Sequence, residues 1–189
     1  MSIIIHVGMS KAASTSIQNI TNTHQDFYYF GKHAKIDSKS NNRYSSAESA
    51  YLTRSIINLE KFTGFEKSSI KKINQEINQA KKNKKIFFFS NEQFCESTCP
   101  MYQAMLIKQV FKTPKILIVI RNQVEALLSH YRFAGHFLKF APNPYKRKII
   151  KFDDYFTNLL ENFNNNGGHK ARDWVSDYLR ILDLDKFIK

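Results

Sequence analysis

The chain alternates between short, continuous runs of apolar residues and longer segments in which apolar residues recur every three or four positions. Continuous runs rich in β-branched or aromatic residues, at 3–7, 85–90 and 115–120, indicate strands, whereas the longer spacing indicates amphipathic helices. The run at 115–120 is typical of a strand buried on both faces of a parallel sheet. The pattern therefore predicts strands and helices in turn.

This alternation predicts an α/β fold. In chain order the expected elements are a strand at 3–7, a helix at 14–23, a polar stretch, helices at 46–60 and 68–82, a strand at 85–90, a helix at 100–110, a strand at 115–120 and a helix at 122–134. Helices that connect successive strands favour a parallel sheet. We therefore expect a three-layer sandwich with a central parallel sheet, formed by a single domain over residues 1–189.

The C-terminal part, residues 140–189, is expected to be helical. Pro142 marks a break after the last predicted helix. Apolar residues then recur at helical spacing from Phe152 to Phe163, and again around Trp174. This spacing predicts two further helices.

Composition narrows the class of protein. At 189 residues, 42% hydrophobic and 14% aromatic, the chain can bury a substantial core. No apolar stretch approaches the roughly 18 residues that span a bilayer, and a strand that begins at Ile3 leaves no room for a signal segment. We therefore expect a cytoplasmic protein with no membrane span. Cys95 and Cys99 are the only cysteines, which argues against structural zinc.

The turn after the first strand carries the clearest candidate chemistry. One lysine, two alanines and three hydroxyl residues precede a predicted helix: Lys11, Ala12, Ala13, Ser14, Thr15 and Ser16. Backbone N–H groups and the positive end of the helix dipole converge at such a turn, which favours oxyanion binding over a plain turn without ligand. A nucleoside-triphosphate P-loop needs lysine directly before its Mg²⁺-binding hydroxyl. Lys11 lies three residues before Ser14, which disfavours a nucleotide kinase.

A second candidate site follows the strand at 115–120. Arg121 comes directly after this strand, and Ser129 lies two turns into the next predicted helix. Open α/β sheets bind ligands outside the carboxyl ends of their strands. Arg121 and Ser129 are therefore candidate ligand-binding residues, with a surface arginine and an ordinary helical serine as the alternatives.

Glu92 is the first candidate for a catalytic base. It follows the strand at 85–90, so we expect it at the same edge of the sheet as the other candidate residues. A carboxylate in this position can accept a proton during catalysis, or it can cap the next helix. His6, His24 and His33 are further candidate bases, and His6 could instead be a buried core histidine.

Together these motifs resemble those of sulfotransferases that use 3′-phosphoadenosine 5′-phosphosulfate (PAPS). The family's phosphosulfate loop has the form K-x-G-T-T, with a K-x-A-S-T-S variant among glycan O-sulfotransferases. Its 3′-phosphate motif has a form like R-N-P-x-x-x-x-x-S-x-Y. In this chain Ala13 replaces the commoner glycine, and Gln123 replaces the proline. The resemblance by motif covers residues 3–16 and 85–133.

The resemblance implies a P-loop-like sulfotransferase fold and transfer of a sulfuryl group from PAPS to a hydroxyl acceptor, with a carbohydrate as the expected acceptor. It implies that residues 11–16 hold the 5′-phosphosulfate and that Arg121 and Ser129 hold the 3′-phosphate. Glu92 would accept the acceptor proton, and Lys11 would donate to the leaving phosphate. No metal is implied.

Departures from the family leave an alternative open. Family members continue with a further strand and a basic loop such as R-K-G, and this chain stops where that strand is expected to start. The fold is thus expected to be C-terminally incomplete, and a non-catalytic module that binds nucleotides or polyanions is the alternative function. Residues 31–66 form a variable region expected on the acceptor side.

The net charge fits an anionic partner. With 29 Lys and Arg against 16 Asp and Glu, the formal charge is +13, which suits PAPS or an acidic glycan. Nucleic acid would also suit this charge, but the lysines around the helix at 68–82 form no single tract and are expected to be a solvated face. Nucleic acid is therefore not an expected partner.

Overall fold

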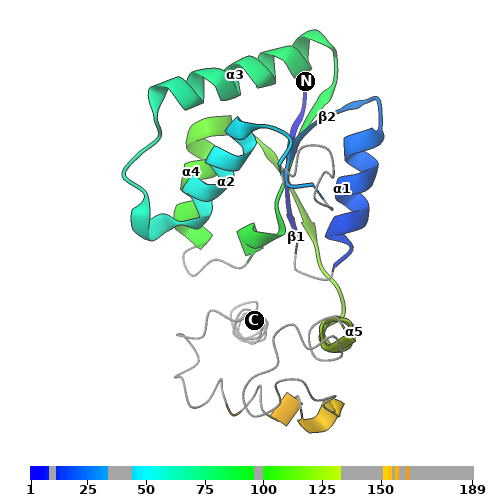
Figure 1. Ribbon diagram of the computed structural model, residues 1–189. Helices are drawn as coiled ribbons and strands as arrows, with labels where there is room; N and C mark the ends of the chain where they lie inside the picture. Colours follow the sequence, from blue (N-terminus) through cyan, green and yellow to red (C-terminus); the bar gives the residue numbers. More distant parts are fainter. Residues whose placement is uncertain are drawn as a thin grey trace. The chain divides into compact units, whose positions relative to one another are not determined.

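The computed structural model describes residues 1–8, 12–33, 44–95, 100–132, 151–154, 156–157 and 161. The chain divides into two compact units, Met1–Ile120 and Arg121–Lys189. The first unit holds the sheet and the helices that cover it (Figure 1). The expectation of a single domain stays a prediction.

The sheet of the first unit is parallel throughout. Its strands are β1 (Ile3–Gly8), β2 (Phe27–Gly31), β3 (Ile86–Ser90) and β4 (Lys115–Val119), in the order β2-β3-β1-β4. A parallel sheet with helices on its faces confirms the α/β class. The prediction of a polar stretch after the first helix is wrong over β2. The aromatic residues of β2 form a strand because they pair with β3.

Of the five helices in the described ranges, three match their predicted bounds to within one residue. They are α1 (Ser14–Thr23), α2 (Ala47–Ile57), α3 (Lys67–Lys82), α4 (Pro100–Phe111) and α5 (Gln123–His130), with short 3₁₀ turns η1 (Leu59–Lys61) and η2 (Glu92–Cys95). Ser46 begins α2 by accepting a hydrogen bond from the Ser49 amide at 3.1 Å. The helix expected over 46–60 is interrupted because α2 ends at Ile57 and η1 follows.

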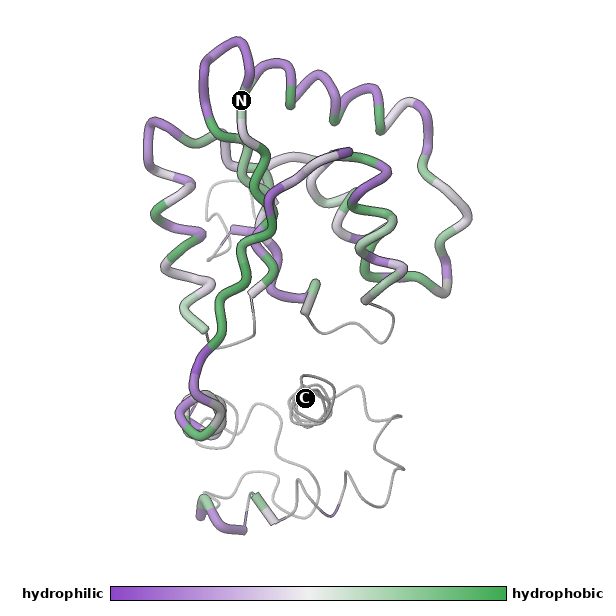
Figure 2. Tube along the Cα trace, turned by 180° about the vertical axis from the view of Figure 1, so that it is seen from behind, coloured by the Kyte–Doolittle hydropathy of each residue, from purple (hydrophilic) through white to green (hydrophobic). Residues whose placement is uncertain are grey.

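The apolar core lies between the sheet and three helices, α2, α3 and α4, while α1 covers the opposite face (Figure 1). Phe30, Phe87, Phe89 and Ile5 supply its strand side. The helix side is apolar as well: Leu52, Ile56, Ile73, Ala80, Leu106, Ile107 and Phe111. Figure 2 shows the strands as mainly hydrophobic and α3 as alternating between hydrophobic and hydrophilic positions, as its amphipathic pattern predicts.

The burial of β4 differs from the predicted burial. The strand is present, but it lies at the edge of the sheet, with Ile116 50% and Ile118 61% exposed. The expectation that it is buried on both faces is therefore wrong. A continuous apolar run indicates a strand, but it does not determine what covers that strand.

The second unit is described over α5 and a few residues beyond it. The Tyr131 ring meets the Phe152 ring edge-on, with the centroids 5.4 Å apart, and residues 152–154 are helical, as predicted. The helix expected around Trp174 lies outside the described residues. None of the helices in the described ranges is long and apolar enough to cross a membrane.

Candidate oxyanion site

Polar residues lie near the carboxyl ends of the two central strands, on the face that α1 covers. His6 of β1 pairs in register with Ser90 of β3, and both side chains are fully buried. Successive side chains of a strand point to opposite faces, so His6 and Ser90 face away from their core-facing neighbours Ile5 and Phe89. The two strand ends therefore place a buried polar pair beneath α1.

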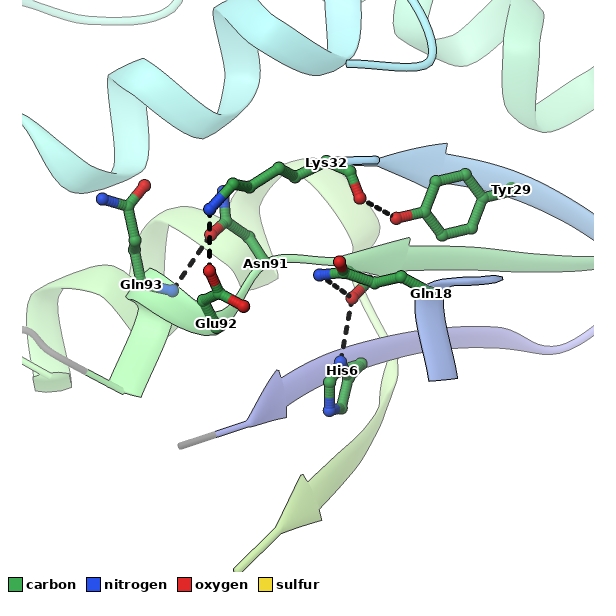
Figure 3. A network of polar contacts seen from close by, with 8 residues as sticks. His6, Gln18, Tyr29, Lys32, Asn91, Glu92 and Gln93 are labelled. Atoms are coloured by element: carbon green, nitrogen blue, oxygen red, sulfur yellow. Dashed lines mark hydrogen bonds and ion pairs between the residues drawn. The ribbon is translucent and has the colours of Figure 1, made fainter. Parts of the chain in front are cut away.

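The hydroxyl of Ser90 joins two side chains. His6 Nδ1 lies 2.8 Å from Ser90 Oγ, and Gln18 Nε2 of α1 donates to the same oxygen at 3.3 Å, as Figure 3 shows. Burial raises the pKa of the Tyr29 hydroxyl, which lies on the neighbouring strand β2. The Tyr29 hydroxyl donates its own hydrogen to the Lys32 carbonyl oxygen.

The hydrogen bond between His6 and Ser90 fits either tautomer of the neutral imidazole. Ser90 Oγ accepts from Gln18, and it has a hydrogen to donate to Nδ1 as well as a second lone pair to accept from Nδ1–H.

Nε2 of His6 is buried and has no hydrogen-bond partner among the residues that the structure describes. It lies near the end of β1 and the start of α1, because a Cβ atom built on Gly8 would meet His6 Nε2 at 2.6 Å and Ser14 Oγ at 2.8 Å. Any side chain at position 8 would thus collide with both groups. Burial lowers the pKa of His6 below its ordinary 6.5, and the Glu92 charge acts in the opposite direction.

The N-terminus of α1 has features that favour a negative charge. Ala13 precedes it in the left-handed conformation, with φ 63° and ψ 17°, and supplies no side-chain cap. The amides of Ser16 and Ile17 both donate to the Ala13 carbonyl oxygen, so the preceding amides point out of the helix end. The first turn contains no acidic residue. The helix end thus presents positive potential without a carboxylate of its own to neutralise it.

Glu92 begins η2, two residues after the last residue of β3. Its Oε1 accepts from Lys32 Nζ at 2.7 Å, and both side chains are about a quarter exposed, at 26% and 24%. The neighbouring Asn91 donates its amide to the His6 carbonyl oxygen at 3.3 Å, which ties η2 to β1. The predicted base therefore lies at the same sheet edge as His6, in an ion pair that the sequence did not indicate.

The predicted site residues fall into three groups. Ala12 and Ser14 are buried, whereas Ala13, Thr15 and Ser16 are exposed at the start of α1. Lys11 lies outside the described residues.

The 3′-phosphate candidates belong to the second unit. Arg121 forms an ion pair with Glu125 at 3.3 Å, and Ser129 is half-buried on α5. Their binding role stays a prediction.

Four residues of the polar network were absent from the predicted site: Gln18, Tyr29, Lys32 and Ser90. The sequence contained a signal for Ser90, since this residue ends the same strand that precedes Glu92. Gln18 had none, because its role depends on which face of α1 meets the sheet.

Comparisons of the chain with protein-family models, with curated proteins and with solved structures found no match. Within the described ranges, no group of three or more His, Cys, Asp or Glu side chains could hold a metal ion. The function is therefore inferred from the site and from the sequence motifs.

Proposed function

We propose that this chain is a PAPS-dependent sulfotransferase that transfers a sulfuryl group to a hydroxyl acceptor, with a carbohydrate as the preferred acceptor class. The observation that carries the proposal is the backbone of Ala13. It occupies the position where the sulfotransferase loop has glycine, and its φ of 63° lies in the region that favours glycine. The backbone of an alanine in this conformation is strained, and strained residues of this kind are common at ligand-binding turns.

The start of α1 supplies what a phosphosulfate requires. Its outward amides and helix dipole favour a negative charge. Gly8 keeps the end of β1 free of a side chain where His6 and Ser14 approach. Lys11 and the hydroxyl groups of Thr15 and Ser16 would add further donors to the 5′-phosphosulfate.

The proposed reaction is an in-line displacement at sulfur. The bond between the acceptor oxygen and sulfur forms while the bond between sulfur and the bridging phosphate oxygen breaks, and the electron pair of that bond stays on the 5′-phosphate. The acceptor proton passes to Glu92. Lys11 and the loop amides stabilise the charge that develops on the leaving phosphate. Arg121 and Ser129 are the proposed ligands of the 3′-phosphate.

One observation favours a second candidate, a non-catalytic nucleotide-binding module. Lys32 already holds Oε1 of Glu92 at 2.7 Å, so an acceptor proton has only the other carboxylate oxygen to reach unless this ion pair opens. Binding and chemistry therefore have to be tested separately.

The binding test compares the product nucleotide 3′-phosphoadenosine 5′-phosphate (PAP) with ATP by thermal unfolding. At a hundredfold excess over its Kd, PAP should stabilise the fold by about 2.7 kcal/mol, which raises the Tm of a chain of this size by roughly 5–10 °C. ATP should have a much smaller effect. Equal shifts with both nucleotides, or no shift with either, would contradict the PAPS assignment.

The chemical test uses Glu92→Gln in a sulfate-transfer assay with labelled PAPS. This variant should keep its PAP affinity and lose roughly 10²–10⁴-fold in turnover, the usual contribution of a general base. Glu48→Gln is the matched control, since Glu48 also pairs with a lysine, Lys72, at 3.4 Å. PAP binding without any transfer by the unaltered chain would favour the binding module instead.

A further inference from the structure

Lysine side chains gather at the edge of the sheet where the strands begin, which is the edge opposite the candidate oxyanion site. Two segments supply them, the turn from α3 into β3 at 81–85 and the connection from α4 into β4 at 108–115. Neither segment contains an acidic residue. All but the half-buried Lys85 are exposed: Lys81, Lys82, Lys84, Lys85, Lys108, Lys112 and Lys115.

The strand order brings these two segments together. Only β1 lies between β3 and β4, so the two strands begin about 10 Å apart across the sheet, which is two strand spacings. The turn from α3 into β3 is seen as hydrophilic beside the N-terminus in Figure 2. In the sequence the lysines form no single tract, and the fold combines them into one basic edge.

Within the described part of the chain, no carboxylate neutralises this edge. None of its lysines forms an ion pair there. Two acidic residues on neighbouring segments have other partners. Asp26 Oδ2 lies 3.8 Å from His24 Nδ1, and Glu76 Oε2 accepts from the Tyr28 hydroxyl at 2.6 Å. An unneutralised cluster of like charges attracts a polyanion.

Two of the lysines occupy backbone positions that favour glycine. Lys84 has φ 55° just after α3, and Lys112 has φ 57° just after α4. Glycine would end both helices with less strain. A helix C-terminus favours a cation, but Lys81, Lys82 and Lys108 in the last turns already supply one. The two strained lysines therefore indicate a use for their side chains beyond ending the helices.

We propose that this basic edge is a docking surface for an acidic polysaccharide, whose carboxylate or sulfate groups pair with lysines from both segments. Lysine is a compact charge on a flexible stem, which suits anionic groups spaced along a polymer. Single-stranded nucleic acid is held by stacking its bases on aromatic rings. The aromatic residues adjoining the two segments, Phe87 and Phe111, are instead buried in the core.

The choice of a polysaccharide rests on the proposed function, in which the acceptor is a carbohydrate. The docking surface gives that acceptor a second contact, separated from the candidate site by the length of β1, about 20 Å. An acidic chain bound along the sheet would thus be held at one end while a hydroxyl near its other end receives the sulfuryl group.

The experiment measures heparin binding by isothermal titration calorimetry at about 0.1 M salt, where surface charges more than about 10 Å apart are screened. Neutral dextran serves as the blank. The edge variant combines three substitutions: Lys82→Gln, Lys84→Gly and Lys112→Gly. Its matched control removes the same charge from exposed lysines near the start of α3: Lys61→Gln, Lys67→Gln and Lys71→Gln.

Heparin affinity should fall at least about fivefold in the edge variant, since three exposed ion pairs are lost. It should fall less than about twofold in the control. Glycine suits the two left-handed positions, so the edge variant should keep the Tm of the unaltered chain. An equal loss in both variants would show that heparin responds to net charge alone and would overturn the inference.

Two further arms separate the partner classes and the two proposals. DNA that bound more tightly than heparin, and lost affinity only in the edge variant, would assign the surface to nucleic acid and contradict a polysaccharide. PAP titration should give the same Kd for the edge variant and the unaltered chain. If PAP bound while the contrast in heparin affinity was absent, only the docking surface would be wrong. If PAP failed to bind, the proposed function would be wrong, and the contrast would still support the surface.

Discussion

The two faces of one sheet differ sharply in this protein. On the face covered by α2, α3 and α4, neighbouring strands contribute Ile5, Phe87 and Phe89 to a continuous apolar core. On the face covered by α1, the next residues along the same strands are His6 and Ser90, joined by a hydrogen bond. Adjacent residues of the same strand thus lie on opposite faces, one in the apolar core and the other in the polar network. The apolar face supplies most of the stability, and the polar face forms the candidate site.

The helices reflect the same difference. Aromatic rings pack closely in the core, with the centroids of Phe30 and Phe87, and of Phe89 and Phe94, 5.1 Å apart. α1 instead buries only polar side chains, namely Ser14, Gln18 and Thr21, and leaves Ile20 61% exposed. The hydrogen bond from Gln18 to Ser90 links α1 to the sheet. Such contacts tolerate adjustment around a ligand better than a close-packed core.

The largest expected effect comes from truncating the apolar face. Phe89→Ala should lower the free energy of unfolding by about 3–5 kcal/mol, since it leaves a cavity in the core. Ser90→Ala should cost only about 1–3 kcal/mol, the penalty for groups left unpartnered at His6 and Gln18. Urea unfolding measures both, and PAP titration should show the reverse order of effects on binding. If Ser90→Ala proved the more destabilising, the division between the two faces would be wrong.

A smaller effect should appear as a dependence of the free energy of unfolding on pH, and it should come from the polar face alone. The pKa of His6 is lowered from 6.5 in the folded chain, so the unfolded chain binds more protons just below that pH. Stability should therefore be complete above about pH 6.5 and fall as the pH drops through the folded-state pKa, by at most about 1.4 kcal/mol per pH unit. Urea unfolding at several pH values gives this slope, and His6→Asn should reduce it. An unchanged slope in that variant would assign the acid sensitivity to other groups.

The smallest expected effect is a change in stability at the start of α1, on the polar face. Ala13→Gly should raise stability by up to about 1 kcal/mol, because relief of the left-handed strain exceeds the added entropy of the unfolded chain. Ala12→Gly, at a buried neighbour without positive φ, should instead lower stability by roughly 1 kcal/mol. Thermal unfolding distinguishes the two signs. Destabilisation by both variants would argue against a strained turn.

Local patterns in the sequence predicted most elements of the first unit. The helix expected over 14–23 agrees with α1, because its boundaries depend on nearby residues. β2 was missed because its five residues form a strand only by pairing with β3, a partner more than fifty residues later in the chain. The exposure of β4 was missed for a related reason, since burial depends on strand order.

The candidate site was predicted in part. The motif identified the turn into α1 and indicated Glu92 after β3. It did not identify the Ser90 network, because the partners of the Ser90 hydroxyl come from β1 and α1 and meet only in the folded sheet. The same applies to Lys32, whose ion pair with Glu92 spans sixty positions.

The central claim is that an anionic nucleotide binds at the polar end of β1 and the start of α1. Titration of PAP into ¹⁵N-labelled protein, followed by amide chemical shifts, tests it most directly. The largest shifts should occur at Gly8, Ser14 and Thr15, and PAP should move them more than ATP does. If the largest shifts instead fell on the lysines of α3, or if no amide at the start of α1 moved, the claim would be contradicted.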